Sequence, residues 1–265
     1  LEKPSYLFGT HHLAPITILD SIPGFDEAFN STSLVVGEFN MAEMMSPDAM
    51  QFMQKNMFID NDTTLNMLFT PDEFTLVNKF AKENMRVDLE MAQKLKPSFI
   101  SNNVAIVVYM KHYPGFNPQE QLDMYIQQKG TEQGKKVGAL ETMEFQVQLL
   151  FNSQSLKRQA ELLVCNLIDE EKTFNDMKRL TEGYMSENIN ALHEMSLEKL
   201  GTHCDPLPGE MEAMVDDRNI QWVRPLTAMI KNEPTFVVVG VLHLPGENGL
   251  IDLLKKEGYT VEAVQ

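Results

Sequence analysis

Short continuous apolar runs alternate along this chain with longer stretches in which apolar residues recur every three or four positions. Four of the apolar runs end in glycine or in a polar turn, which is typical of buried strands. These four runs lie within residues 5–10, 32–40, 135–140 and 235–243. Two further runs, at residues 102–110 and 259–264, predict strands in the same way.

The remaining pattern is helical. Between Ser46 and about Phe99 the apolar positions keep a spacing of three to four, and Pro71 followed by two acidic residues marks a helix start. Further helices are predicted near residues 118–129, 142–177, 188–200 and 248–258, and from about residue 210 onward. Pro225 is expected to kink or divide the helix in which it lies.

Strands therefore alternate with helices, and long helical stretches interrupt them. This order predicts an α/β (α+β) fold with a central mixed sheet. We expect a single domain over residues 1–265, with helical insertions at about 41–99 and 142–232.

The charge balance narrows the possible partners. The 265 residues include 22 Lys and Arg against 38 Asp and Glu, a net charge of −16, so the protein's field should repel nucleic acid and anionic lipid. No apolar run approaches the roughly 20 residues that span a bilayer. We therefore expect a peptide or small-molecule substrate and no transmembrane segment; the sequence does not indicate an oligomeric state.

The expected location depends on the first residues. "LEKPSY" lacks the features of a signal peptide, yet the first strand follows it directly. We expect that an export signal or lipid anchor has been removed, as in a periplasmic protein, a lipoprotein or an extracellular protein; a cytoplasmic location is the alternative. Cys165 and Cys204 could form one disulfide, a question that their spacing leaves open.

Four residues with catalytic side chains follow predicted strands. Gly9 and Gly240 each close a strand and are each followed three positions later by a histidine, His12 and His243, while Glu38 and Glu141 come just after the other two strands. Ligands of open α/β sheets bind where the carboxyl ends of the strands converge. We therefore expect His12, Glu38 and His243 to share one cleft.

Imidazole and carboxylate groups suit hydrolysis in two ways. Two neutral histidines and a glutamate can hold a divalent metal that activates water. Without a metal, one histidine can act as a general base that the glutamate orients. The structural alternative is that each histidine is a hydrogen-bonded core residue. His11 should point away from His12 along an extended backbone.

Several segments together resemble one family. "YLFGTHHL", "GALETMEFQ", "DDRNIQW" and "VVGVLHLPGENGLIDLLKKEGYTVEAV" occur in the order found in the TraB/GumN family, which includes bacterial pheromone-shutdown and GumN-like proteins and the animal TIKI proteins. The resemblance implies a fold similar to erythromycin esterase and the ChaN-like proteins. It also implies a divalent-metal-dependent peptidase or hydrolase, since the TIKI members are proteases, with manganese or cobalt expected and zinc possible.

The resemblance also assigns roles to individual residues. It maps the family's two Gly-x-x-His motifs and its acidic position onto His12, His243 and Glu38, the expected metal ligands and catalytic residues. It marks Arg218 and Asn219 as a recurring pair, with Arg218 binding a substrate carboxylate or oxyanion, or orienting Glu38 or Glu141. The alternative for Arg218 is a surface salt bridge with Asp216 or Asp217.

Five further residues are expected either to contact the substrate or to support these ligands: Gly9, His11, Glu141, Asn219 and Gly240. Glu141 could instead cap the helix that follows it. Two other functions stay open alongside the metal-dependent hydrolase. One is a regulatory protein that binds a peptide or small ligand without catalysis. The other is a metal-independent hydrolase resembling an esterase, in which His12 or His243 is the base.

Overall fold

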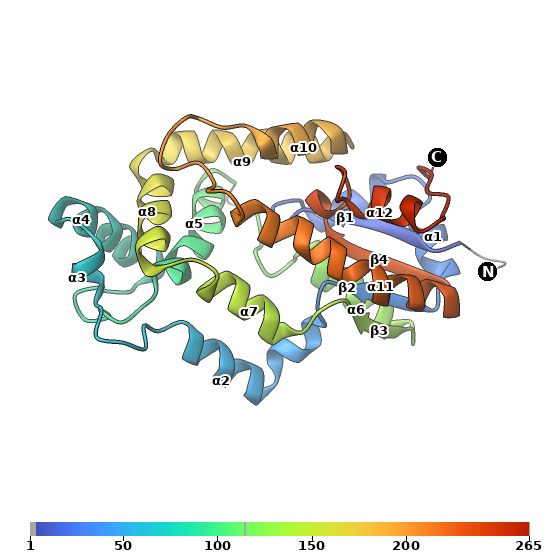
Figure 1. Ribbon diagram of the computed structural model, residues 1–265, viewed down its shortest axis with the longest axis horizontal. Coiled ribbons are helices and arrows are strands. Elements are labelled where there is room, and N and C mark those ends of the chain that lie inside the picture. The colour runs from blue at the N-terminus through green and yellow to red at the C-terminus, as the bar shows by residue number, and fades with distance from the viewer. Residues whose placement is uncertain (1–3, 114, 265) are drawn as a thin grey trace. The chain divides into compact units, whose positions relative to one another are not determined.

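The computed structural model describes residues 4–113 and 115–264, and its chain forms two compact units (Figure 1). Unit 1 contains the residues up to Glu43, Pro118–Thr142, and the residues from Leu180 onward. Unit 2 contains Met44–Asn117 and Met143–Arg179.

Unit 1 is built around a four-stranded sheet. Its strands, in the spatial order β1-β4-β2-β3, are β1 (Tyr6–Thr10), β4 (Thr235–Gly240), β2 (Leu34–Gly37) and β3 (Lys136–Ala139). The predicted α/β class is confirmed. Within the described residues all three strand pairings are parallel, so the sheet is not mixed as expected. Each connection contains helices that return the chain to the starting edge, as parallel pairing requires.

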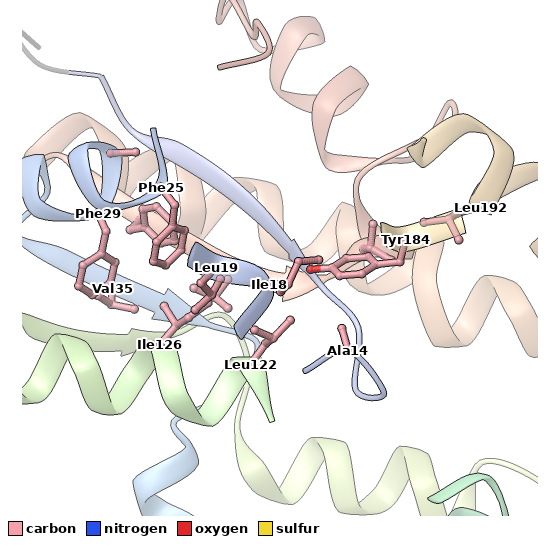
Figure 2. Close-up of a cluster of buried hydrophobic side chains, with 14 residues drawn as sticks. Ala14, Ile18, Leu19, Phe25, Phe29, Val35, Leu122, Ile126, Tyr184 and Leu192 are labelled. Carbon is pink, nitrogen blue, oxygen red and sulfur yellow. The ribbon is translucent and has the colours of Figure 1, made fainter. Parts of the chain in front are cut away.

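Helices cover both faces of this sheet. In β4, Phe236 and Val238 face one core cluster, whereas Val237 and Val239 face the other, as the two-residue period of a strand dictates. The elements that contribute to the first cluster include η1 (Ile16–Ser21), α1 (Phe25–Ser31), α6 (Leu122–Glu132) and α10 (Ile189–Leu197). The second cluster includes residues of α11 (Asp217–Asn232) and α12 (Leu250–Lys256). Figure 2 shows the first cluster, with Leu122 and Ile126 of α6 inside it.

Helix α11 differs from its prediction. It follows a π-helical turn, η4 (Glu212–Asp216), and continues through Pro225 without division. Pro225 cannot donate a hydrogen bond to the carbonyl of Gln221, but Gln221 lies on the exposed side of the helix, where water can satisfy that carbonyl.

Two of the predicted strands are wrong. Residues 102–110 belong to α5 (Pro97–His112), a helix of unit 2 whose buried Ile100, Val104 and Val108 are spaced four residues apart. An apolar run can form a strand or a buried helix. Here the length of 16 residues and the proline at the first position both favour a helix. Residues 259–264 form no strand, although Tyr259 and Val261 pack against the second core cluster.

Unit 2 consists of helices, with one isolated bridge between Phe58 and Leu95 among its described residues. The helices are α2 (Pro47–Asn56), α3 (Leu65–Leu68), α4 (Pro71–Phe80), η3 (Ala81–Met85), α5, α7 (Met143–Asn152), α8 (Leu156–Ile168) and the first part of α9 (Glu170–Met185). The predicted start at Pro71 is confirmed, because Thr70 and Glu73 form a capping box there. None of the helices in the described ranges has the length and apolar content needed to cross a membrane.

Candidate functional site

The four candidate residues that follow strands all lie at one edge of the sheet. His12 follows β1, Glu38 follows β2, Glu141 follows β3, and His243 ends η5 (Val241–His243) directly after β4. Because the strands are parallel, their carboxyl ends share this edge. Thr10 pairs with Gly240, so the two Gly-x-x-His segments, distant in sequence, leave the sheet from neighbouring strands.

Glu38 is held by both of its carboxylate oxygens. Oε1 accepts a hydrogen bond from the Gly240 amide at 2.8 Å and lies 3.6 Å from Nε2 of His243, and Oε2 accepts from Nη2 of Arg218 at 2.5 Å. A Cβ atom on Gly240 would lie 3.3 Å from Oε1, so glycine gives the carboxylate room. Burial raises the pKa of Glu38, but His243, Arg218 and the Gly240 amide together lower it below its usual value.

Arg218 of α11 uses all five of its N–H groups. Nε and Nη2 bind the two oxygens of Glu141 at 3.1 and 2.8 Å, and the second Nη2 hydrogen reaches Glu38. Nη1 donates to the carbonyl of Met214 at 2.9 Å and lies 3.1 Å from Nε2 of His243. The buried guanidinium is therefore saturated, and its partners are not the neighbouring Asp216 and Asp217 considered from the sequence.

Glu141 is a highly connected carboxylate in the group that it forms with Glu38, Arg218, Trp222 and His243. Its side chain is 7% exposed, and besides Arg218 it accepts a hydrogen bond from the indole N–H of Trp222 at 3.0 Å. Trp222 also packs against two neighbours. The Arg218 guanidinium carbon lies 4.6 Å from the centre of the Trp222 ring, and the centre of the His243 imidazole lies 4.5 Å from it. Glu141 thus fixes Arg218 and Trp222, which in turn contact His243.

His243 is buried and is oriented by Asn219. The Asn219 amide nitrogen donates to the carbonyls of His243 and Asn248, at 3.2 and 2.9 Å, so its Oδ1 is the atom that faces Nδ1 of His243 at 2.7 Å. Nδ1 must then carry the proton, which leaves the Nε2 lone pair directed toward Arg218 and Glu38. Burial, followed by the charge of Arg218, lowers the pKa of His243 to about 4, although Glu38 opposes the shift.

This shift predicts a pH dependence of stability. A folded pKa of about 4 against 6.5 in the unfolded chain means that the unfolded chain binds the proton first as the pH falls. The stability from neutral His243 is therefore complete above about pH 6.5 and is lost toward pH 4, by up to about 1.4 kcal/mol per pH unit. His11, whose pKa is also lowered to about 4, acts in the same direction.

Urea unfolding of the metal-free protein between about pH 7 and pH 4.5 measures this slope. A His243→Gln variant should show a flatter dependence than the wild type, whatever its absolute stability. Equal slopes in the two proteins would mean that His243 takes up its proton alike in the folded and unfolded states.

His12 lies beside a carboxylate that the sequence analysis missed. The His12 side chain is 69% exposed, and its Nδ1 is 3.5 Å from Oδ2 of buried Asp123, in the first turn of α6. Thr10 of β1 donates to Oδ1 of Asp123 at 2.7 Å. Burial raises the pKa of Asp123, as does the charge of Glu38, whereas His12 and Thr10 oppose the rise. Asp123 therefore lies within electrostatic reach of Glu38.

A signal for Asp123 was present in the sequence. In parallel α/β folds, a helix that precedes a strand runs back along the sheet and begins at the edge where the strands end. An acidic residue in the first turn of the helix before β3 is thus placed at the same edge as Glu141.

His11 points away from this group. Its Nε2 is 3.0 Å from the hydroxyl of Thr181, and its ring packs against Tyr184, whose hydroxyl donates to the Gly9 carbonyl at 2.8 Å. Burial, together with His12, lowers the pKa of His11. Gly9 allows β1 to approach η5, since a Cβ atom there would lie 3.0 Å from the Cα of Val241. Gly9 and His11 thus fix the position of the chain just before His12.

The cluster has the donor atoms of a divalent-metal site, although they are not gathered around one point. Among the described residues, ligand atoms of His12, Glu38 and His243 do not form a group within 4.8 Å of one another. Two imidazole–carboxylate pairs are present instead, Glu38 with His243 and Asp123 with His12. Asp123 Oδ2 is buried and has no hydrogen-bond donor. The donor types fit a divalent cation of the Mn, Co or Zn kind.

Comparison with known proteins places the chain in a family. The TraB/PrgY/gumN family profile matches residues 2–263. The chain belongs to this family. Among curated proteins it is similar to a metalloprotease TIKI2 from Danio rerio, with 22% identity over 306 aligned positions that cover 98% of this chain. The chain spans 58% of the length of that relative. No solved structure matches significantly.

Proposed function

We propose that this chain is a divalent-metal-dependent hydrolase that cleaves peptide bonds. Its similarity to a protein named a metalloprotease supports this proposal, as do the acidic and imidazole groups at the carboxyl edge of the sheet. The observation that carries it is the pair formed by Glu38 and His243. A carboxylate oxygen and an unprotonated imidazole nitrogen lie 3.6 Å apart, next to the glycine that ends β4.

In this proposal His12, Glu38 and His243 hold the cation, with manganese or cobalt favoured and zinc as a further candidate. The bound metal would supply an activated water and would polarise the scissile carbonyl. Asn219 keeps the proton of His243 on Nδ1, so a cation bound through Nε2 would displace the Nη1 hydrogen of Arg218 that faces this nitrogen. His243, Arg218 and the Gly240 amide together keep Glu38 ionised. Because the N–H groups of Arg218 are all engaged, we assign it to positioning Glu38 rather than to binding substrate.

A metal-independent hydrolase is the second candidate, and one observation favours it. The guanidinium of Arg218 already lies beside both Glu38 and Nε2 of His243, where it supplies positive charge to the site. His243, with its lowered pKa, is neutral near pH 7 and could accept a proton through Nε2. Metal binding and its consequences for turnover separate this candidate from the first.

We also propose that the protein acts in an oxidising compartment, as an exported protein does. Neither of its two cysteines is a free thiol in the structure. Disulfides persist outside the reducing cytosol, which supports export over a cytoplasmic location. The substrate is expected to be a peptide or a small molecule with a hydrolysable carbonyl.

Replacing Glu38 with glutamine tests the metal site. The variant keeps the size of the side chain but removes the charge that balances a dication, so Mn²⁺ affinity should fall about tenfold or more. Arg218 retains Glu141 as its partner, so the loss of unfolding free energy should stay below about 3 kcal/mol. Trp222 is the single tryptophan and packs against His243, so quenching of its fluorescence by Mn²⁺ or Co²⁺ reports on binding.

Glu233→Gln is the matched control. Glu233 also forms an ion pair, with Lys136. It lies just before β4, at the amino ends of the strands and therefore at the edge of the sheet opposite to Glu38. Its loss should leave metal affinity unchanged. If Glu38→Gln binds metal and turns over substrate as the wild type does, Glu38 is neither a ligand nor the catalytic carboxylate.

A further inference from the structure

The two Gly-x-x-His histidines have matching surroundings. Nδ1 of His243 faces Oδ1 of Asn219 from α11, and Nδ1 of His12 faces Oδ2 of Asp123 from α6. The two helices contribute to different core clusters, on opposite faces of the sheet. In both cases a helix presents a side-chain oxygen to Nδ1 rather than to Nε2.

The oxygen of Asp123 that faces His12 lacks a hydrogen-bond donor. Asp123 is 9% exposed, and Thr10 satisfies its Oδ1, but Oδ2 is buried without a hydrogen bond. Such an atom costs free energy unless a donor reaches it. Nδ1 of His12 is 3.5 Å away, beyond the roughly 2.7–3.2 Å of a formed hydrogen bond. Because the His12 ring is largely exposed, a small rotation of that ring can close the gap without moving the fold.

Asp123 itself is firmly placed. The residues around it on α6, Leu122 and Ile126, lie in the core cluster shown in Figure 2. One turn later Gln127 accepts from the Met41 amide at 3.0 Å and donates to the Phe39 carbonyl at 3.1 Å.

The loop that begins at Glu38 is therefore tied to the same helix. A Cβ atom on Gly37 would lie 2.1 Å from Nε2 of Gln127, so the glycine at the end of β2 makes this connection possible. Helix α6 thus links the end of β1 with the end of β2, and Asp123 is its contact with β1.

We propose that Asp123 is a positioning residue for His12: it accepts the Nδ1 proton, fixes the imidazole tautomer and directs Nε2 to the metal. A carboxylate in this place also makes the ring a stronger ligand. The role in metal binding rests on the proposed function, whereas the tautomer of His12 can be measured without any metal.

The first test is the ¹⁵N spectrum of the histidine rings in the metal-free protein, near pH 8, where an unperturbed imidazole is neutral. A His12→Asn variant assigns the His12 signals. The wild type should show the Nδ1–H tautomer at His12. In Asp123→Asn, Thr10 keeps Oδ1 and the amide N–H₂ then faces Nδ1, so His12 should shift toward the Nε2–H tautomer. A wild-type His12 in the Nε2–H form would overturn the proposal.

The second test measures Mn²⁺ affinity in a double-mutant cycle. Asp123→Asn should weaken binding about 10- to 100-fold. In a His12→Ala background the same change should have little further effect, because Asp123 acts through His12. Asp20→Asn, which removes an exposed carboxylate from the same unit, is the matched control and should bind as the wild type does.

The outcomes separate the two proposals. A wild type that binds none of Mn²⁺, Co²⁺ and Zn²⁺ overturns the metal-dependent function and the metal-binding role of Asp123 together, and the tautomer then decides the orienting role by itself. A wild type that binds metal while Asp123→Asn binds equally well overturns the role of Asp123 alone. An equal loss with and without His12 would make Asp123 a direct ligand and contradict the positioning role.

Discussion

Replacing Arg218 with methionine is expected to lower the free energy of unfolding by about 3–5 kcal/mol, the usual cost of removing one partner from a buried ion cluster. The guanidinium is buried and balances Glu141, 7% exposed, and Glu38, 18% exposed. Without it, both carboxylates and the carbonyl of Met214 lose a donor. Methionine preserves much of the apolar contact with Trp222, so the expected loss reflects charge and hydrogen bonding.

Denaturant unfolding with a matched variant measures this effect. Arg224→Met changes an exposed arginine of the same helix and should shift stability by no more than about 0.5 kcal/mol. Adding Glu141→Gln to Arg218→Met should restore part of the loss, because one uncompensated charge is removed. If Arg218→Met were as stable as Arg224→Met, the cluster would not be an electrostatic unit of the fold.

The sequence predicts the sheet edge well because its signals are local. A short apolar run that ends in glycine at β1 or β4 needs no distant information, and neither does the position of Glu38 or Glu141 after a strand. The order of the strands in the sheet, in contrast, is not a local property. It depends on which runs pair across more than two hundred residues, so the parallel sheet could not be read from any single segment.

The predictions that failed also depended on tertiary contacts. The apolar run of α5 is rich in β-branched residues, but burial of one helical face in unit 2 outweighs their strand propensity. Residues 259–264 pair with no strand of the described chain, although Tyr259 and Val261 pack against the second core cluster as strand residues would. Arg218 carries acidic neighbours on its own helix, and only the tertiary fold shows that its partners come from two strand ends. Asp123 stands in no motif and gains its meaning from the start of α6.

Replacing His243 with alanine is expected to reduce turnover by orders of magnitude and to lower stability by only about 1–3 kcal/mol. The activity should fall because the variant lacks the imidazole that is proposed to bind the metal, and excess metal should restore little of it. The stability falls because Asn219 loses the partner of its Oδ1 and Trp222 loses a packed ring. The two losses are therefore separable on one sample of protein.

A partly buried histidine elsewhere in unit 1 provides the control. His193 of α10 packs near Gly246, and within the described residues it makes no hydrogen bond to Glu38, Arg218 or His243. His193→Ala should lose some stability and keep its turnover per folded molecule. This comparison removes the general effect of deleting an imidazole from the same unit.

The most direct measurement is the cleavage of an unbiased peptide library, followed by mass spectrometry and expressed per folded molecule, for the wild type, His193→Ala and His243→Ala. We expect the wild type and His193→Ala to cleave peptides, to lose this activity to a chelator and to regain it with Mn²⁺ or Co²⁺, and we expect His243→Ala to stay inactive throughout. A fully active His243→Ala protein, or cleavage that is indifferent to the chelator, would contradict the metal-dependent function proposed for this site.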